Sequence, residues 1–216
     1  MGRGKPRPYE PRGYAAAVRV FLGITGASGA PYADGILRAL VAAGCEVGVC
    51  ASAAGVEVLA TELYRDASLG RDEVLSRFVG DAPAEQVTVV GIDDWRSRYA
   101  SGSAKVDAYV VCPCSMATVG TLASGAMSNL IHRAASVALK ERRTLVLVPR
   151  ETPLSAIHLR GLATLHEAGA VILFAAPGFY HGADTVQDLV DFVVARCLDQ
   201  LGIDNDLIHR WGADDA

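Results

Sequence analysis

Short apolar runs alternate along this chain with segments of helical periodicity, and this alternation limits the folds that the chain can adopt. Strands are predicted at about 18–24, 46–51, 86–90, 108–112, 144–148 and 171–174. The main helices are predicted over about 31–43, 52–62, 128–142, 155–168 and 185–201. Strands that alternate with helices at this spacing form a parallel sheet with right-handed crossovers. We therefore predict one α/β domain built on a single doubly wound parallel sheet.

Length and composition narrow the class of protein. The 216 residues are enough for one domain, which we place at 18–216, after a basic Pro/Gly-rich tail at 1–17 that we expect to be disordered. No apolar run approaches the length of a membrane span, and the tail does not resemble a signal peptide. A net charge of −4 argues against a nucleic-acid partner. These features predict a cytoplasmic protein.

The five cysteines are an odd number, and their spacing does not suggest a disulfide framework. Cys112 and Cys114 flank Pro113, but no second cysteine pair or nearby histidine completes a metal site, so no metal is predicted. We interpret both cysteines as small packing residues. Half of the residues are hydrophobic, mostly aliphatic, which indicates surface buried between subunits of a homo-oligomer.

A glycine-rich turn, Gly23 to Pro31, follows the first predicted strand and precedes a helix. Such a turn either simply reverses the chain or brings free N–H groups to a phosphate. Its glycine spacing is not the dinucleotide fingerprint, and Ser52 rather than an acid follows the second strand. We expect Ser28 and Ser52 to reach one phosphoryl group, which favours a mononucleotide over NAD.

The fourth strand is expected to break at Pro113, and hydroxyl groups again follow it. Ser115 and Thr118 are suitable helix N-caps, which is the more common role for such residues. Together with Ser28 and Ser52 they would also bracket a mononucleotide at the point where the strand order reverses.

Charged residues surround the fifth predicted strand. Arg133 and Lys140 are seven residues apart on one helix face, and Arg150 and Glu151 follow the strand directly. A helix C-terminus and a surface ion pair would explain these charges without function. We instead expect all four to converge on the strand end as the wall of a ligand site.

Three residues near the C-terminus have both a structural and a functional interpretation. Tyr180 follows the sixth strand and is either core or ligand, and Arg196 is either a solvated helix position or a ligand. Trp211 has no core pattern around it, and an aromatic residue of this kind often packs on a neighbouring chain.

These motifs carry a resemblance to a known family. They are ITGASGAPYA, ATE at 60–62, CPCSMAT, SNLIHRAASVALKERRTLVLVPRETPLSAIHL, AGAVIL, PGFYH and DLVDFVVARCLDQLGI, which together cover 18–211. The chain resembles the UbiX-type flavin prenyltransferases, once described as aromatic-acid decarboxylases. The resemblance implies a flavodoxin-like, usually dodecameric flavoprotein that joins a dimethylallyl group from dimethylallyl phosphate to N5 and C6 of reduced FMN, without a metal. The product, prenylated FMN, would serve a UbiD-type decarboxylase.

The resemblance also implies site residues. Flavin contacts would be Gly26, Ala27, Ser28, Ser52, Ser115, Met116, Ala117, Thr118 and Arg150. The prenyl-phosphate pocket would comprise Lys140, Arg150, Tyr180 and Arg196, with Arg133 and Glu62 from neighbouring chains and Trp211 as a further aromatic face. Glu151 and Ser28 would manage protons, and Glu62 and Lys140 complete the catalytic set. Ser136 and Gly182-Ala183 depart from the family pattern beside this pocket, which leaves a monophosphate or diphosphate donor open.

Two other functions compete with this one. A flavoprotein decarboxylase of the Cys-peptide type would have the same fold, but it carries a Pro-x-Met-Asn-x-x-Met-Trp segment where this chain has Pro113-Cys-Ser-Met-Ala-Thr. A non-catalytic FMN carrier would not need Lys140, Arg150, Glu151 and Arg196 beside the flavin.

Overall fold

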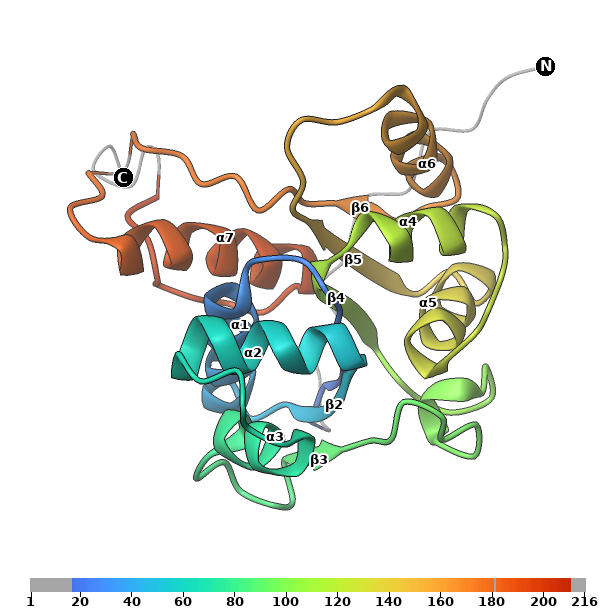
Figure 1. The fold of residues 1–216 in the computed structure, drawn as a ribbon, viewed down its shortest axis with the longest axis horizontal. Coiled ribbons are helices and arrows are strands. Elements are labelled where there is room, and N and C mark those ends of the chain that lie inside the picture. Colours follow the sequence, from blue (N-terminus) through green and yellow to red (C-terminus); the bar gives the residue numbers. More distant parts are fainter. Residues whose placement is uncertain (1–16, 181, 211–216) are drawn as a thin grey trace.

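A computed structural model describes residues 17–180 and 182–210, so the predictions for the tail up to residue 16 and for Trp211 lie outside the described residues. Its centre is one parallel sheet in the order β3-β2-β1-β4-β5-β6 (Figure 1). The strands are β1 (Arg19–Ile24), β2 (Glu46–Ala51), β3 (Val87–Val89), β4 (Ala108–Cys114), β5 (Thr144–Pro149) and β6 (Val171–Ile172). The predicted doubly wound sheet is confirmed.

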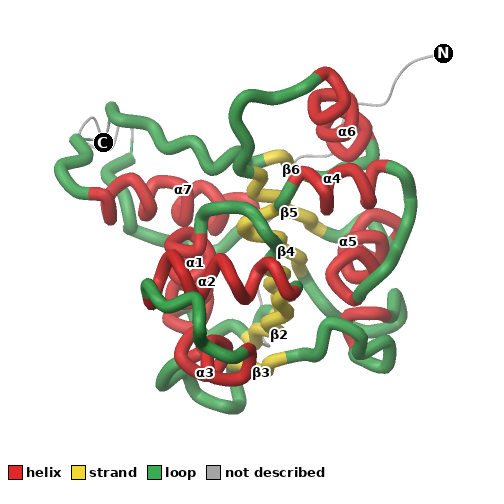
Figure 2. The backbone as a smooth tube through the Cα atoms, in the orientation of Figure 1, coloured by secondary structure: helices red, strands yellow, loops and turns green. Residues whose placement is uncertain are grey.

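Helices cover both faces of the sheet (Figure 2). They are α1 (Ala30–Ala42), α2 (Ala53–Tyr64), α3 (Arg71–Val79), α4 (Met116–Ala123), α5 (Leu130–Lys140), α6 (Ala156–Glu167) and α7 (Val186–Leu201), with a short 3-10 helix, η1 (Arg98–Ala100). Alternate residues of β1 enter opposite cores, as the two-residue period of a strand requires. Leu22 packs with α1 and α7, whereas Phe21 packs with α4, α5 and η1.

The predicted end of the fourth strand at Pro113 is wrong, because β4 continues to Cys114. Proline has no N–H for the ladder, and the register between β4 and β5 shifts between Val111 and Cys114. Pairing resumes at Cys114 with Pro149. The carbonyl oxygen of Pro113 stays in use, since it accepts a hydrogen bond from the backbone N–H of Thr25 at 3.1 Å. The proline therefore bends the strand end toward β1 without breaking it.

Helix α2 lies across the carboxyl edge of the sheet. At its start, the N–H of Ser52 donates to the carbonyl of Ile24 at the end of β1. In its last turn, the side chain of Glu62 accepts hydrogen bonds from the N–H groups of Gly29 and Ala30, where α1 begins. Both ends of α2 thus contact the edge from which α1 departs. The helix forms one wall above the glycine-rich turn.

Hydroxyl and amide side chains begin the helices that start at the carboxyl edge. Ser52, Ser115, Asn129, Ser155 and Thr185 each accept a hydrogen bond from a backbone N–H in the first turn of their helix. The caps predicted at Ser52 and Ser115 are confirmed. Each satisfies a donor that the helix itself leaves unpaired.

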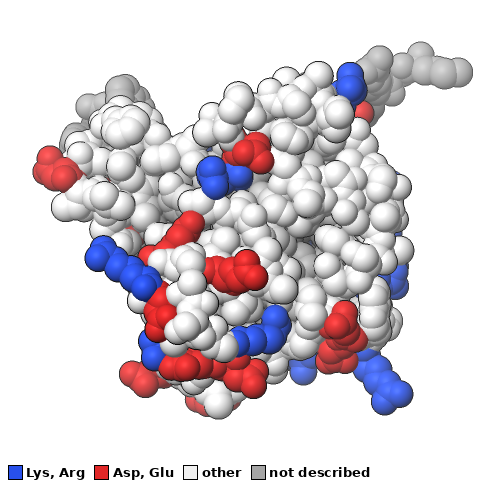
Figure 3. Space-filling view, in the orientation of Figure 1, with Lys and Arg blue, Asp and Glu red and all other residues white. Residues whose placement is uncertain are grey.

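Several large apolar side chains lie on the surface. Ile157 on α6 is 73% exposed, Phe179 before α7 is 74% exposed and Val186 at the start of α7 is 76% exposed. Figure 3 shows charged side chains gathered around α2 and α3, whereas the surface around α4 and α6 carries few. Among the described helices, none is both long and apolar enough to cross a membrane.

Candidate functional site

The strand order reverses between β1 and β4, and both strand ends are joined there by Thr25. Its hydroxyl donates to the carbonyl of Pro113 at 3.0 Å and accepts from the N–H of Ser115 at 2.8 Å. Thr25 is 3% exposed, so these bonds are shielded from water. Open α/β sheets bind ligands in the crevice at such a reversal. Thr25 was missed from the sequence, although a hydroxyl residue directly after a buried strand was the available signal.

A pocket of about 300 Å³ opens at this reversal. Its lining consists mostly of small and hydroxyl-bearing residues from the ends of β1, β2 and β4 and the starts of α2, α4 and α5: Thr25, Gly26, Ser52, Ala54, Ser115, Ala117, Thr118, Thr121, Asn129 and His132. Five predicted flavin contacts are among them, namely Gly26, Ser52, Ser115, Ala117 and Thr118. The structure therefore brings together residues that are up to 92 positions apart in the sequence, from Gly26 to Thr118.

The other predicted flavin contacts lie near this pocket but do not line it. Ala27 and Met116 are buried, and Ser28 is exposed in the glycine-rich turn, next to the pocket residue Gly26. Arg150 is exposed directly after β5. Among the described residues, its guanidinium group makes no hydrogen bond or ion pair. Arg150 is thus a cation at the carboxyl edge that is available to a ligand.

Three helix N-termini meet at the pocket, and this makes it suitable for an anion. Ser52 begins α2, Ser115 begins α4 and Asn129 begins α5, and all three residues line the pocket. The N-terminus of a helix presents unpaired N–H groups and the positive end of the helix dipole. The hydroxyl of Ser115 also lies 3.1 Å from that of Thr118. Helix capping and ligand binding are therefore compatible at these serines.

Glycine is required at position 26 because α2 lies so close. A Cβ atom at Gly26 would be 2.5 Å from the Cβ of Ala54, well inside normal contact distance. At Gly29 the backbone itself requires glycine, since φ is +133°. Gly26 thus allows the close approach of the turn to α2, and Gly29 allows the backbone conformation at the start of α1.

The contacts of Glu62 seen here lie within its own chain, and its predicted contribution to the site of a neighbouring chain stays a prediction. Its carboxylate lies in its own chain, 2.9 Å from the N–H of Gly29 and 2.8 Å from that of Ala30. Gly29 has no side chain to cap α1, so Glu62 supplies the missing acceptor. The reason is the path of α2, which returns to the carboxyl edge instead of running down the sheet. Glu62 thus lies beside Ser28.

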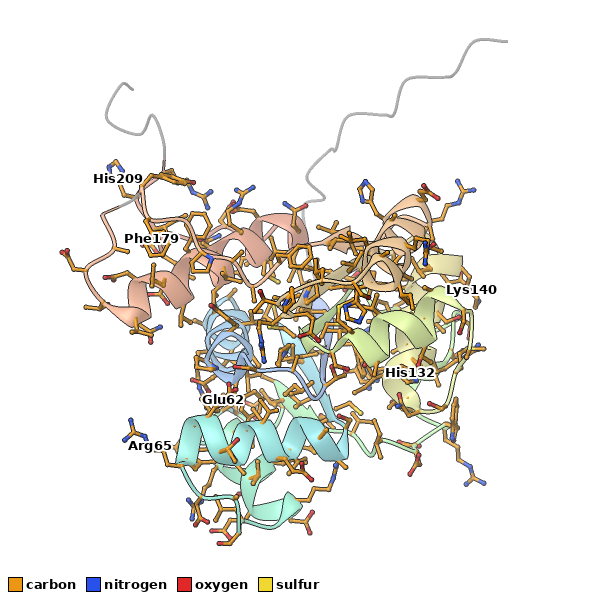
Figure 4. All side chains as sticks on the ribbon, turned by 45° about the horizontal axis from the view of Figure 1, so that its top comes forward. Glu62, Arg65, His132, Lys140, Phe179 and His209 are labelled. Carbon is orange, nitrogen blue, oxygen red and sulfur yellow. The ribbon has the colours of Figure 1, made fainter. Side chains whose placement is uncertain are left out.

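The predicted convergence of Arg133, Lys140, Arg150 and Glu151 on one strand end does not occur within a single chain. Helix α5 begins at the carboxyl edge and runs back along β5, so Lys140 in its last turn lies at the amino edge, paired with Glu141. Figure 4 shows Lys140 on the side of the molecule opposite Phe179. Arg133 is half-buried and donates from Nε to the carbonyl of Ala100 at 2.9 Å. Only Arg150 and Glu151 remain at the strand end.

Tyr180 and Arg196 lie outside the pocket in the same chain. Tyr180 is 65% exposed, and its ring packs edge-on against Phe192 of α7 at a centroid distance of 5.8 Å. Arg196 is exposed on α7 and pairs with Asp199 at 2.7 Å. Asp199 also pairs with Arg210 near the end of the described chain. The tyrosine and Arg196 are therefore surface groups in a single chain.

The cysteines are buried and unpaired. Burial raises the pKa of the Cys114 and Cys197 thiols to about 12, so both are protonated near neutral pH. Their interpretation as packing residues is confirmed for Cys112 and Cys114, which are fully buried. Within 17–180 and 182–210, no group of three or more His, Cys, Asp or Glu side chains is placed to hold a metal ion.

Comparison with known proteins places the chain in a family. The family model named Flavoprotein matches residues 9–198. The chain is 50% identical over 198 residues to the flavin prenyltransferase UbiX of Pseudomonas aeruginosa, a match that covers 90% of this chain and 94% of that relative. The chain belongs to the UbiX family of flavin prenyltransferases. The resemblance inferred from the sequence motifs is thereby confirmed.

Solved structures of UbiX proteins share the fold in detail. The AnUbiX (PadA1) complex with FMN and dimethylallyl pyrophosphate has a TM-score of 0.80 and 37% identity, and the match covers 91% of this chain and 98% of that one. The dodecameric FMN-dependent UbiX-like decarboxylase from Escherichia coli O157:H7 has a TM-score of 0.79 and 35% identity, and the match covers 90% and 99%.

Proposed function

We propose that this protein is a flavin prenyltransferase that joins a dimethylallyl group to N5 and C6 of reduced FMN. The observation that supports this most directly is the hydroxyl-lined pocket at the β1/β4 reversal, where three helix N-termini meet, in a member of the UbiX family. The pocket suits one phosphate and a polyol chain. Among the relatives of known structure, AnUbiX forms a complex with both FMN and dimethylallyl pyrophosphate.

The residues of this chain fit FMN. Ser52, Ser115 and Thr118 would hold its polar tail with the N–H groups of α2 and α4, and Gly26 would let the flavin approach the backbone. Arg150 would lie beside it at the end of β5. When bound, reduced FMN supplies the nucleophilic ring atoms. The protein has to orient that ring, exclude water and neutralise the leaving group.

Breaking the allylic C–O bond leaves a phosphate anion and a cation-like prenyl fragment. We assign the phosphate to Lys140, Arg150 and Arg196, because fixed positive charge stabilises negative charge that develops in the reaction. The prenyl fragment would lie against aromatic faces, including Tyr180. Trp211, outside the described residues, is a second aromatic candidate.

Proton transfer is assigned to groups at the carboxyl edge. Glu151 follows Arg150 and is half-buried, and its Oε1 lies 3.2 Å from the N–H of Thr152. Ser28 lies in the glycine-rich turn near Glu62. A positioned carboxyl group that exchanges protons with the reacting flavin is the usual solution for such a step.

The site requires more than one chain, because Lys140 and Arg150 lie at opposite edges of the sheet. We propose a homo-oligomer, a dodecamer like the Escherichia coli neighbour, in which Lys140 of one chain faces the pocket of another. Arg133 is half-buried and would contribute only its exposed end. The exposed side chains of Ile157, Phe179 and Val186 would be covered in such an assembly.

The remaining assignments concern the cellular setting. The folded unit would be residues 18–216, and its prenylated FMN would be passed to a UbiD-type decarboxylase. Five unpaired cysteines suit a reducing compartment, so we assign the protein to the cytoplasm.

Mass spectrometry of the extracted flavin tests the proposal. Purified protein is titrated with FMN, reduced anaerobically and incubated with dimethylallyl monophosphate or diphosphate in separate reactions. We expect saturable FMN binding and a flavin heavier by one five-carbon prenyl unit with at least one donor. Binding of FMN without any prenylated product would instead favour a non-catalytic carrier. Release of carbon dioxide from a C-terminal cysteine peptide would favour a Cys-peptide decarboxylase.

A further inference from the structure

His132 is a titratable residue of the pocket that the proposed reaction has not used. It lies in the first turn of α5, one turn after the N-cap Asn129, and is 7% exposed. It nevertheless lines the pocket at the β1/β4 reversal. Figure 4 shows it on the same side of the molecule as Lys140, which lies at the other end of helix α5. A nearly buried imidazole that still reaches a ligand pocket has a side open to that pocket.

The hydrogen bonds of the ring determine which nitrogen carries the proton. Nδ1 of His132 lies 3.4 Å from the backbone N–H of Ser128 and 3.0 Å from the hydroxyl of Ser128. A backbone N–H can only donate, so Nδ1 is an acceptor. In a neutral imidazole the other nitrogen is then protonated. Burial lowers the pKa of His132, which keeps the ring neutral near pH 7.

The Nε2–H group has no acceptor among the described residues. Within the described residues, the fully buried side-chain N or O atom without a partner is Oδ1 of Asn205, so Nε2 of His132 is reached from the pocket, where water or a ligand can accept its hydrogen bond. The pocket is where this donor can find an acceptor. Around it, the lining carries the hydroxyls of Ser115 and Thr118 and the amide of Asn129. This polar surrounding suits the oxygen-rich tail of a nucleotide better than an aromatic ring.

We propose that His132 is a flavin-binding residue whose Nε2–H donates a hydrogen bond to an oxygen of the ribityl phosphate tail of FMN. The inference rests on the proposed function, since it takes FMN as the ligand. It makes Ser128 a positioning residue, because its N–H and hydroxyl hold the ring in the tautomer that donates into the pocket. The first turn of α5 then contributes both its N-terminus and a side chain to the same ligand.

Two substitutions separate the donor from the rest of the ring. His132→Asn keeps a polar group near the position of Nδ1 but does not reach the position of Nε2. His132→Gln extends an amide N–H to about the position of Nε2. We expect His132→Asn to raise the Kd for FMN about tenfold, the effect of one lost hydrogen bond, and His132→Gln to raise it at most about threefold. His166→Asn on exposed α6 is the matched control and should bind FMN like the unaltered protein.

Fluorescence titration with FMN measures these constants, and thermal melting of the apo proteins checks folding. An unchanged Kd for His132→Asn would overturn the proposal, as would equal weakening by both substitutions. The unaltered protein gives an independent test if a variant does not fold. With ¹⁵N-labelled histidine, the Nε2–H resonance of His132 should shift when FMN is added, and no shift would also overturn it. Failure of the unaltered protein to bind FMN would refute the proposed function instead.

Discussion

Replacing Glu62 with alanine should destabilise the protein before any chemistry is considered. The carboxylate accepts two backbone hydrogen bonds, from Gly29 at 2.9 Å and from Ala30 at 2.8 Å. These N–H groups belong to the start of α1, where Gly29 provides no side-chain cap. Glu62→Ala leaves both donors without their acceptor and removes a negative charge from the positive end of the helix dipole.

The size of the effect follows from these two bonds. A hydrogen bond to a charged group contributes about 1.5–3 kcal/mol, and both bonds here are only partly buried, so water replaces some of the loss. We expect Glu62→Ala to lower the free energy of unfolding by about 2–3 kcal/mol. For a chain of this size, this corresponds to a decrease in Tm of about 4–12 °C. Glu62→Gln keeps an acceptor oxygen and should lose about 1 kcal/mol.

Thermal and urea unfolding of apo protein at one fixed concentration would measure these values. Glu57→Ala is the matched control, because Glu57 is on the same helix but exposed, and its loss should change stability by less than about 0.5 kcal/mol. If Glu62→Ala were as stable as Glu57→Ala, the capping role would be refuted. Any loss of activity in Glu62→Ala would then have to be attributed to catalysis alone.

Three other substitutions test separate parts of the site. Glu151→Gln should still bind FMN but slow prenyl transfer about 100-fold or more in single-turnover assays, and an unchanged rate would leave Glu151 with a structural role only. Lys140→Ala should raise the KM for the prenyl phosphate with little change in FMN affinity, because the phosphate would lose one of its cationic partners. A Kd for FMN that rose as much as this KM would contradict the assignment. Gly26→Ala should weaken FMN binding, because its Cβ would lie 2.5 Å from that of Ala54. Gly120→Ala in α4 is the control: its Cβ meets nothing within 4 Å, so this variant should bind FMN normally and have a more stable helix. Equal FMN affinities of the two variants in titrations would show that the close contact is unimportant.

The fold could be predicted from local patterns because those patterns have local causes. A strand such as β1 requires alternate residues to enter two cores, and a cap such as Ser52 acts within three residues of itself. The lengths of the edge strands were predicted less well. β3 and β6 are shorter than their apolar runs, and each has only one neighbouring strand.

The site could be predicted only where residues directly follow strands. Ser52, Ser115 and Arg150 are placed by the strand that precedes them, so their common edge follows from the parallel order. Glu62 and Lys140 are placed by the direction of a whole helix, which periodicity does not reveal. His132 was missed because a lone histidine on a helix has no distinctive spacing. Its partner Ser128, four residues earlier, is a signal only once the helix start is known.

The distance between Lys140 and the carboxyl edge of its own sheet has a genetic consequence. If each catalytic centre takes Lys140 from one subunit and Glu151 from another, a chain altered at either position damages a centre that it shares. Two impaired variants, Lys140→Ala and Glu151→Gln, would then complement one another when expressed together. With random mixing in equal amounts, about a quarter of the centres would carry both intact residues. Mixed particles would be more active than particles of either variant alone.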